Sequence, residues 1–207
     1  MTEPKPSRRR WKIALGVVVL FAVVGWLVAY PAYQRHRAIE EIERLGGAVY
    51  YRETGPQWLS RWGINFERVE AVDLRYTVKT GGGYKATDNT LQYVSSLTSV
   101  ESLYLGGADI TDDGLRHLTG LTNLQQLILN DTQISDHGLK HLRGLTSLQL
   151  LWLSNTNVTG KGLKCLIALK QLRELEIDSP QITDDEVESL QQALPNVVIN
   201  FVTLYSP

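Results

Sequence analysis

The apolar positions along most of the chain repeat with a fixed period of 24 residues, and short polar stretches separate them. In the L-x-L part of each period, alternate side chains lie on one face of a strand. Leu103 and Leu105 are therefore predicted to face the core and Tyr104 to face outward. The repeating positions are Leu97, Val100, Leu103 and Leu105, then Leu121, Leu124, Leu127 and Leu129, then Leu145, Leu148, Leu151 and Leu153, then Leu169, Leu172, Leu175 and Ile177.

A polar signature follows each strand and predicts the start of a short helix. It reads Ile110-Thr111-Asp112, Ile134-Ser135-Asp136, Val158-Thr159-Gly160 and Ile182-Thr183-Asp184. The Thr or Ser is a good N-cap, and Glu186 completes a capping box with Thr183. The Asp favours the positive helix end, so the helix that carries Gly160 instead is expected to start less firmly. Leucine pairs three residues apart then give each helix one apolar stripe: Leu115 and Leu118, Leu139 and Leu142, and Leu163 and Leu166.

The unit L-x-x-L-x-x-L-x-L-x-x-T-x-I-T-D-x-G-L-x-x-L resembles the leucine-rich-repeat family, in particular short bacterial membrane-anchored repeat proteins with the I-T-D-x-G-L signature. The resemblance implies an α/β solenoid, a horseshoe with a parallel sheet on the concave side and short helices on the convex side. We assign residues 66–193 to the repeats, with an inserted stretch at 77–86. Residues 194–207 are expected to form a C-terminal cap, a half-repeat shifted by about one residue.

An uncharged apolar run from Ile13 to Tyr30 predicts a single transmembrane helix, because its length as a helix is close to a bilayer's hydrocarbon thickness. Residues 1–12 carry five basic side chains, so the positive-inside rule predicts a cytoplasmic tail and extracytoplasmic repeats at the cell membrane. A cleaved secretory signal is the alternative, and Ser7 to Lys12 weakly resembles a twin-arginine export signal.

Residues 31–65 are expected to form a juxtamembrane helix and an N-terminal cap for the repeats. Arg35 to Leu45 has the pattern of an amphipathic helix, and Gly46-Gly47 is a typical helix stop. A first strand is possible at Ala48 to Tyr51, and Trp58 and Trp62 are candidates to cover the first core layer.

Composition narrows the classes of function. A chain of 207 residues with 43% hydrophobic side chains suffices for one core. The net charge is -1, and the basic tail leaves the folded part acidic, so no nucleic-acid partner is expected. Cys165 is the only cysteine, so no intrachain disulfide forms. The sequons at Asn130-Asp131-Thr132 and Asn157-Val158-Thr159 matter only in a host that glycosylates exported proteins.

No motif predicts catalysis, a metal site or a cofactor. His117, His141 and Cys165 share one helix column, but neighbouring helices are roughly 8–10 Å apart, too far for one zinc ion. The Gly81-Gly82-Gly83 run lacks the Lys and Ser/Thr of a phosphate-binding loop. No serine, histidine and carboxylate are brought together by the pattern. The protein is therefore expected not to be an enzyme.

The outward strand positions differ between repeats and are the candidate binding site. Tyr104 and Trp152 occupy one outward column two repeats apart, and polar side chains surround them, which is typical of protein-binding surfaces. The candidate concave-face residues are Asp73, Arg75, Tyr104, Ile128, Asn130, Trp152, Asn155, Glu176 and Asp178. The expected partner is a protein or peptide, with carbohydrate less favoured. A structural envelope component and an accessory subunit of an enzyme complex are the alternative functions.

Overall fold

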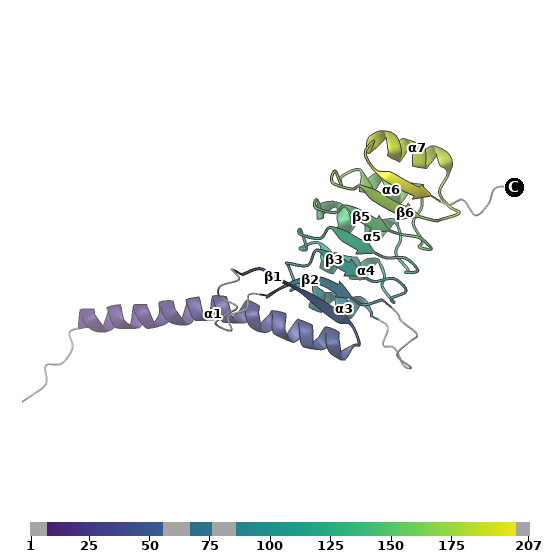
Figure 1. Ribbon diagram of the computed structural model, residues 1–207. Coiled ribbons are helices and arrows are strands. Elements are labelled where there is room, and N and C mark those ends of the chain that lie inside the picture. Colours follow the sequence, from purple (N-terminus) through teal and green to yellow (C-terminus); the bar gives the residue numbers. More distant parts are fainter. Residues whose placement is uncertain (1–7, 56–66, 76–85, 202–207) are drawn as a thin grey trace, which may run out of the picture. The chain divides into compact units, whose positions relative to one another are not determined.

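The computed structural model describes residues 8–55, 67–75 and 86–201. The chain divides into two compact units, residues 1–37 and residues 38–207. The helix α1 (Arg8–Arg44) contributes to both units (Figure 1). Trp58, Trp62, the Gly81–Gly83 run and the end of the C-terminal cap lie outside the described residues.

In the first unit, α1 exposes a long series of large apolar side chains. From Val17 onward the helix is long and apolar enough to cross a membrane, a test that an N-terminal signal sequence also passes. The rings of Trp26 and Tyr30 stack with their centroids 5.0 Å apart. The helix continues through Pro31, so the apolar run and the amphipathic segment that follows it form one helix instead of two.

The second unit is built on a seven-stranded sheet whose strands follow one another in sequence order. Figure 1 shows the strands stacked side by side along the unit. In the chain, each pair of successive strands from β2 to β7 is linked by a repeat helix. The strands are β1 (Ala48–Glu53), β2 (Glu67–Asp73), β3 (Ser102–Tyr104), β4 (Gln126–Ile128), β5 (Leu150–Trp152), β6 (Glu174–Ile177) and β7 (Val198–Phe201). The helices are α3 (Asp88–Val94), α4 (Asp112–Leu115) with η2 (Arg116–Leu118), α5 (Asp136–Leu139) with η3 (Lys140–Gly144), α6 (Gly160–Leu166) and α7 (Asp184–Ala193).

The sheet is parallel from β2 to β7, but β1 pairs with β2 in the antiparallel direction. The repeats predict parallel strands, and β1 differs from them because it belongs to the expected N-terminal cap and to no 24-residue unit. Helix α1 ends as Gly46 adopts a φ of +79°, and β1 starts two residues later. Ala38 and Ile42 at the end of α1 are buried in the same core as the repeats.

The leucine columns form one continuous core between the strands and the helices. Leu103, Leu127, Leu151 and Leu175 align as direct partners in neighbouring strands, and all four are 0% exposed. The helix leucines 115, 118, 139, 142 and 166 are equally buried. The predicted registration of the repeats is therefore confirmed from residue 97 to residue 182.

The C-terminal half-repeat departs from the period only in its first part. Leu194 and Val197 are buried 25 residues after Leu169 and Leu172, as the predicted one-residue shift requires. In β7, however, Ile199 pairs with Leu175, which restores the 24-residue spacing. The extra residue therefore lies before Ile199. A one-residue shift within β7 itself would turn its apolar side chains away from the core.

Candidate partner-binding face

One column of the sheet's outward side joins most of the predicted site residues. Asp73 pairs with Tyr104, Tyr104 with Ile128, Ile128 with Trp152 and Trp152 with Glu176. All five side chains are half-buried. Neighbouring parallel strands are about 4.8 Å apart, so Tyr104 and Trp152 lie roughly 10 Å apart with Ile128 between them. We call this outward side of β1 to β7 the strand face.

A second outward column lies beside the first and is not among the predicted site residues. It runs through Ser102, Gln126, Leu150, Glu174 and Val198, and Tyr50 of β1 pairs with Ala71 at its start. In each repeat strand, the residues before and after the central leucine point the same way. Alternation along the strand could therefore have predicted the repeat residues of this second column. Tyr50 could not be found in this way, because its position depends on the antiparallel pairing of β1.

A hollow of about 190 Å³ opens along this second column. It is lined by Gln125, Gln126, Gln149, Leu150, Arg173 and Glu174. The lining combines amide groups, one guanidinium, one carboxylate and one aliphatic side chain. The strand face is therefore recessed next to Trp152, whose strand also supplies Leu150.

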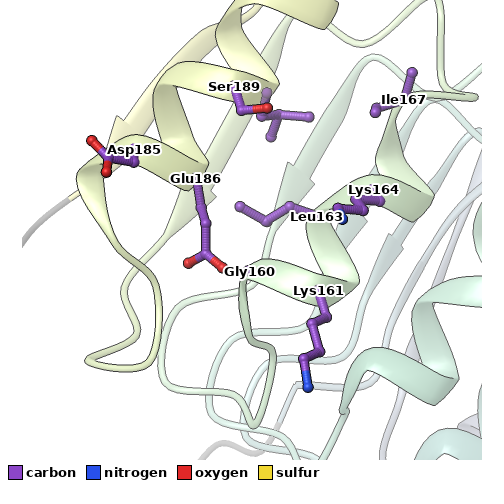
Figure 2. Close-up of a pocket in the computed structure, with 9 residues that line it drawn as sticks. Gly160, Lys161, Leu163, Lys164, Ile167, Asp185, Glu186 and Ser189 are labelled. Carbon is purple, nitrogen blue, oxygen red and sulfur yellow. The ribbon is translucent and has the colours of Figure 1, made fainter.

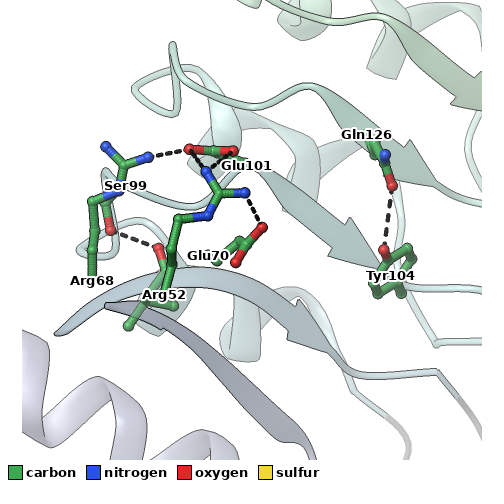
Figure 3. A network of polar contacts seen from close by, with 8 residues as sticks. Arg52, Arg68, Glu70, Ser99, Glu101, Tyr104 and Gln126 are labelled. Carbon is green, nitrogen blue, oxygen red and sulfur yellow. Dashed lines mark hydrogen bonds and ion pairs between the residues drawn. The ribbon is translucent and has the colours of Figure 1, made fainter. Parts of the chain in front are cut away.

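Arg75 joins the two predicted residues at the β2 end of the face. Its guanidinium forms an ion pair with Asp73 at 2.6 Å and lies 5.3 Å from the centroid of the Tyr104 ring. Partial burial raises the pKa of the Asp73 carboxyl, but the hydrogen bonds and positive charge of Arg75 outweigh it and hold that pKa below its ordinary value. The Tyr104 hydroxyl hydrogen-bonds to Oε1 of Gln126 at 3.2 Å (Figure 3). The Tyr104 side chain is thus held at its ring face and at its hydroxyl.

Trp152 is held by a carboxylate of the next strand. Its indole N–H donates to Oε1 of Glu174 at 3.2 Å. The neighbouring carboxylate, Glu176, accepts from the Ser154 hydroxyl at 2.9 Å and from Nδ2 of Asn130 at 3.3 Å. These contacts fix the positions of Trp152 and Asn130 without an ion pair.

Asn155 and Asp178 lie beyond the strand ends and not on the strands themselves. Asn155 is exposed at a φ of 54° in the turn after β5, and its Nδ2 donates to Oδ1 of Asp131 at 2.7 Å. Asp131 has a φ of 59° in the turn after β4, and Asn and Asp tolerate this left-handed backbone region well. Asp178 follows β6, and its carbonyl oxygen accepts from the Asn155 N–H at 3.2 Å. These residues form an edge to the strand face.

Charged residues at the β1 end of the sheet are paired among themselves. Arg52 forms ion pairs with Glu70 and Glu101, and Arg68 forms one with Glu101 (Figure 3). The cluster ties β1 and β2 to the segment that enters β3. Because its two cations face two anions, it presents little net charge to a partner.

On the opposite side of the unit, the aspartates of the repeat signature link neighbouring helices. The carboxylate of Asp112 accepts from the Ser135 N–H at 2.7 Å and from its hydroxyl. Asp136 bonds Thr159 in the same way, at 2.8 and 2.7 Å. Asp88 bonds Thr111 likewise. Each Asp thus holds the helix start of the next repeat, a role stronger than the dipole interaction expected from sequence.

The glycine of the signature is required by the same contact. A Cβ on Gly114, Gly138 or Gly162 would collide with the carboxylate of the Asp in the preceding repeat. The Asp and the Gly are therefore two halves of one junction, which recurs every 24 residues. The helix that begins at Gly160 lacks this Asp but keeps the same cap, because Thr159 is held by Asp136 and accepts from the Lys161 N–H at 3.3 Å like the other caps.

At the next junction, between α6 and α7, the glycine and the carboxylate exchange places, with Gly160 in the Asp column. Glu186 occupies the glycine column, and its Oε2 bonds the N–H and hydroxyl of Thr183 at 3.0 and 3.1 Å. Its carboxylate fills the space in which a Cβ at position 160 would lie (Figure 2). A hollow of about 290 Å³ remains here between α6 and α7. The predicted capping box at Thr183 is confirmed.

The metal-ligand residue types in the helix column do not form a metal site in the part of the chain that the structure describes. No group of three His, Cys, Asp or Glu side chains there could hold a metal ion. Cys165 is buried, with Nη2 of Arg143 at 3.5 Å from its sulfur. His117 and His141 remain half-buried on the helix side.

Comparison with known proteins supports the fold. No protein-family model matches the chain, and no curated protein matches it. Among solved structures, the leucine-rich-repeat ectodomain of the receptor kinase SOBIR1 from Arabidopsis thaliana is 15% identical, with a TM-score of 0.51, over 82% of this chain and 91% of that one.

Two bacterial structures match over a smaller share of their length. A leucine-rich-repeat protein of Leptospira interrogans is 29% identical over 53% of this chain, with a TM-score of 0.43, and an internalin of Listeria monocytogenes is 20% identical over 63%, with a TM-score of 0.41. This chain spans only 27% and 46% of those two proteins. The parallel strands, the repeat helices and the likeness to the plant ectodomain together indicate the leucine-rich-repeat fold for residues 67–75 and 86–201.

Proposed function

We propose that the protein is a membrane-anchored, non-enzymatic interaction protein whose strand face binds a protein or peptide partner. The observation that carries this proposal is the direct registration of Tyr104, Ile128 and Trp152 on an outward face that the fold itself does not fill. Such a strip with a polar edge has the apolar centre and polar rim of a protein-recognition surface.

The contacts around the aromatic rings favour protein over carbohydrate as the partner. The N–H of Trp152 and the hydroxyl of Tyr104 are already engaged by Glu174 and Gln126. The rings therefore offer mainly their apolar faces, held in one orientation, and preorganised aromatic anchors reduce the entropy lost on binding. A protein side chain can use such a surface without new hydrogen bonds to the rings.

Replacing Trp152 with alanine is expected to weaken partner capture by about thirtyfold or more, since a buried aromatic anchor can contribute about 2 kcal/mol of binding free energy. Capture is measured by crosslinking pull-down of the full-length protein from intact membranes. Trp152→Phe is the matched control: it keeps a ring on the face and loses only the N–H bond to Glu174. We expect it to retain most of the captured partner.

The melting temperature of the same samples separates binding from stability. Trp152→Ala should melt within a few degrees of the wild type, because the side chain is half-buried on an outward face. A lower melting temperature with unchanged capture would show that Trp152 only stabilises the sheet. Capture that survives Trp152→Ala but is lost with the anchor would favour the structural envelope role, and a captured catalytic protein would favour the accessory-subunit role.

The anchor assigned to this function is residues 13–30, with residues 1–12 in the cytoplasm and residues 31–65 leading to the repeats outside the cell membrane. The run of exposed apolar side chains on α1 supports it, because such a surface is stable in a lipid bilayer and not in water. The stacked pair Trp26 and Tyr30 lies at the end of this run, where aromatic side chains favour the headgroup region.

The full-length protein is expected to stay in the membrane pellet after alkaline carbonate washing, since a transmembrane helix is not held by charge. Its mature N-terminus is expected to map before residue 30. Release into the supernatant, or an N-terminus beyond residue 30, would show that the segment is a cleaved signal. Residues 38–207 would in either case keep the strand face.

A further inference from the structure

The carboxylates at the two ends of the strand face differ in whether they form ion pairs. At the β2 end, three carboxylates pair with guanidinium groups: Asp73 with Arg75, and Glu70 and Glu101 with Arg52 and Arg68. At the β6 end lie Glu174, Glu176 and Asp178. Within residues 8–55, 67–75 and 86–201, no Lys, Arg or His forms an ion pair with any of these three.

Two of the three carboxylates, Glu174 and Glu176, are held in place by uncharged hydrogen-bond donors. Glu174 accepts from Trp152, and Glu176 accepts from Ser154 and Asn130, so neutral donors fix their positions without cancelling their charge. All three are half-buried, which weakens their solvation. Arg173 is the nearest cation in sequence and lines the hollow together with Glu174, but its guanidinium is not within ion-pair distance of that carboxylate.

Apolar surface adjoins these carboxylates directly. Leu150 pairs with Glu174, and Trp152 pairs with Glu176, on neighbouring strands about 4.8 Å apart. The hollow of about 190 Å³ lies at this boundary and takes in both Leu150 and Glu174. A side chain with an aliphatic stem and a cationic end matches this boundary, because the stem can cover Leu150 and Trp152 while the charge reaches a carboxylate.

We infer that the partner is a peptide segment with a Lys or Arg beside an apolar residue. The cation lies against Glu174, Glu176 and Asp178 at the β6 end, and the apolar side chain lies on Ile128 and Trp152. This inference rests on the proposed function and adds to it the chemistry of the partner and its direction along the face.

The test uses a displayed library of random twelve-residue peptides, selected against the full-length protein in lipid nanodiscs. Selected peptides are expected to carry a Lys or Arg within a few residues of an aromatic or aliphatic residue. Their binding should weaken about tenfold or more in the double variant Glu174→Gln, Glu176→Gln. Glutamine keeps an acceptor oxygen for Trp152, Ser154 and Asn130, so the loss reports on charge and not on the fold.

The double variant Asp185→Asn, Glu188→Gln is the matched control, because it changes the net charge equally on the exposed surface of α7. It is expected to leave peptide binding within about twofold of the wild type, since surface charges farther away than a Debye length of about 8 Å are screened. An equal loss in both double variants, or selected peptides without cations, would overturn the inference.

The same experiment separates the inference from the proposed function. Peptides whose binding needs Trp152 but not the charges of Glu174 and Glu176 would overturn the inference and leave the strand face as the binding site. Selection that yields no peptides, or only peptides indifferent to Trp152→Ala, would overturn both.

Discussion

Replacing Leu127 with alanine is expected to lower the free energy of unfolding by about 2–5 kcal/mol. Leu127 is 0% exposed and pairs with both Leu103 and Leu151, so a cavity there opens in the middle of the leucine stack. Each repeat contacts only its neighbours, so few other contacts can close over the gap. Denaturant titration of the full-length protein in detergent measures the loss.

Gln126→Ala in the same strand is the control. Gln126 is exposed, and its contact to the Tyr104 hydroxyl can be replaced by water. Its effect should be within about 0.5 kcal/mol of the wild type. Equal effects at positions 126 and 127 would contradict the assignment of inward and outward sides.

The second large effect is expected at the reversed junction between α6 and α7. Gly160→Asp should cost about 2–4 kcal/mol, because the new Cβ overlaps the Glu186 carboxylate and two carboxylates then compete for the donors of Thr183. Glu186→Gly should cost about 1–3 kcal/mol, because it leaves those donors without their acceptor and places glycine inside a helix.

The double variant Gly160→Asp, Glu186→Gly is expected to lose less unfolding free energy than the two single variants together. The difference should be about 2 kcal/mol or more. It recreates the junction in which Asp136 bonds Thr159 across from Gly162. Gly120→Asp is the matched control, because a Cβ at Gly120 meets no atom within 4 Å. Additive losses at positions 160 and 186 in a double-mutant cycle would contradict the complementary junction.

The 24-residue period by itself determines most of the repeat unit. It sets which leucines are buried, which side of each strand faces outward and where the Thr or Ser caps lie. These features are local, since alternation along a strand and the spacing on a helix follow from backbone geometry alone. The column with Tyr104 and Trp152 follows in the same way, because equal positions in stacked repeats become neighbours.

Both residues of the reversed junction stand out in the sequence, although the pattern alone does not show that they contact each other. Gly160 and Glu186 are each an exception in their own column, and they lie 26 residues apart. The pattern predicts that the Asp acts on its own helix, because a helix dipole is a local effect. Its bonds run to the next repeat, and only the stacked arrangement of neighbouring helices shows that the two exceptions belong to one contact.

What only the tertiary structure decided lies at the ends of the stack and in the pairing of charges. The period stops before β1, so its antiparallel direction and the place of Tyr50 on the strand face follow from packing against β2 and not from any repeat. Composition shows a mildly acidic folded part but not which acids are neutralised. Arg52 and Arg68 reach Glu70 and Glu101 across neighbouring strands, whereas the carboxylates of Glu174 and Glu176 are bonded by neutral donors. Distances between side chains far apart in the chain depend on how the elements stack, and local sequence does not contain them.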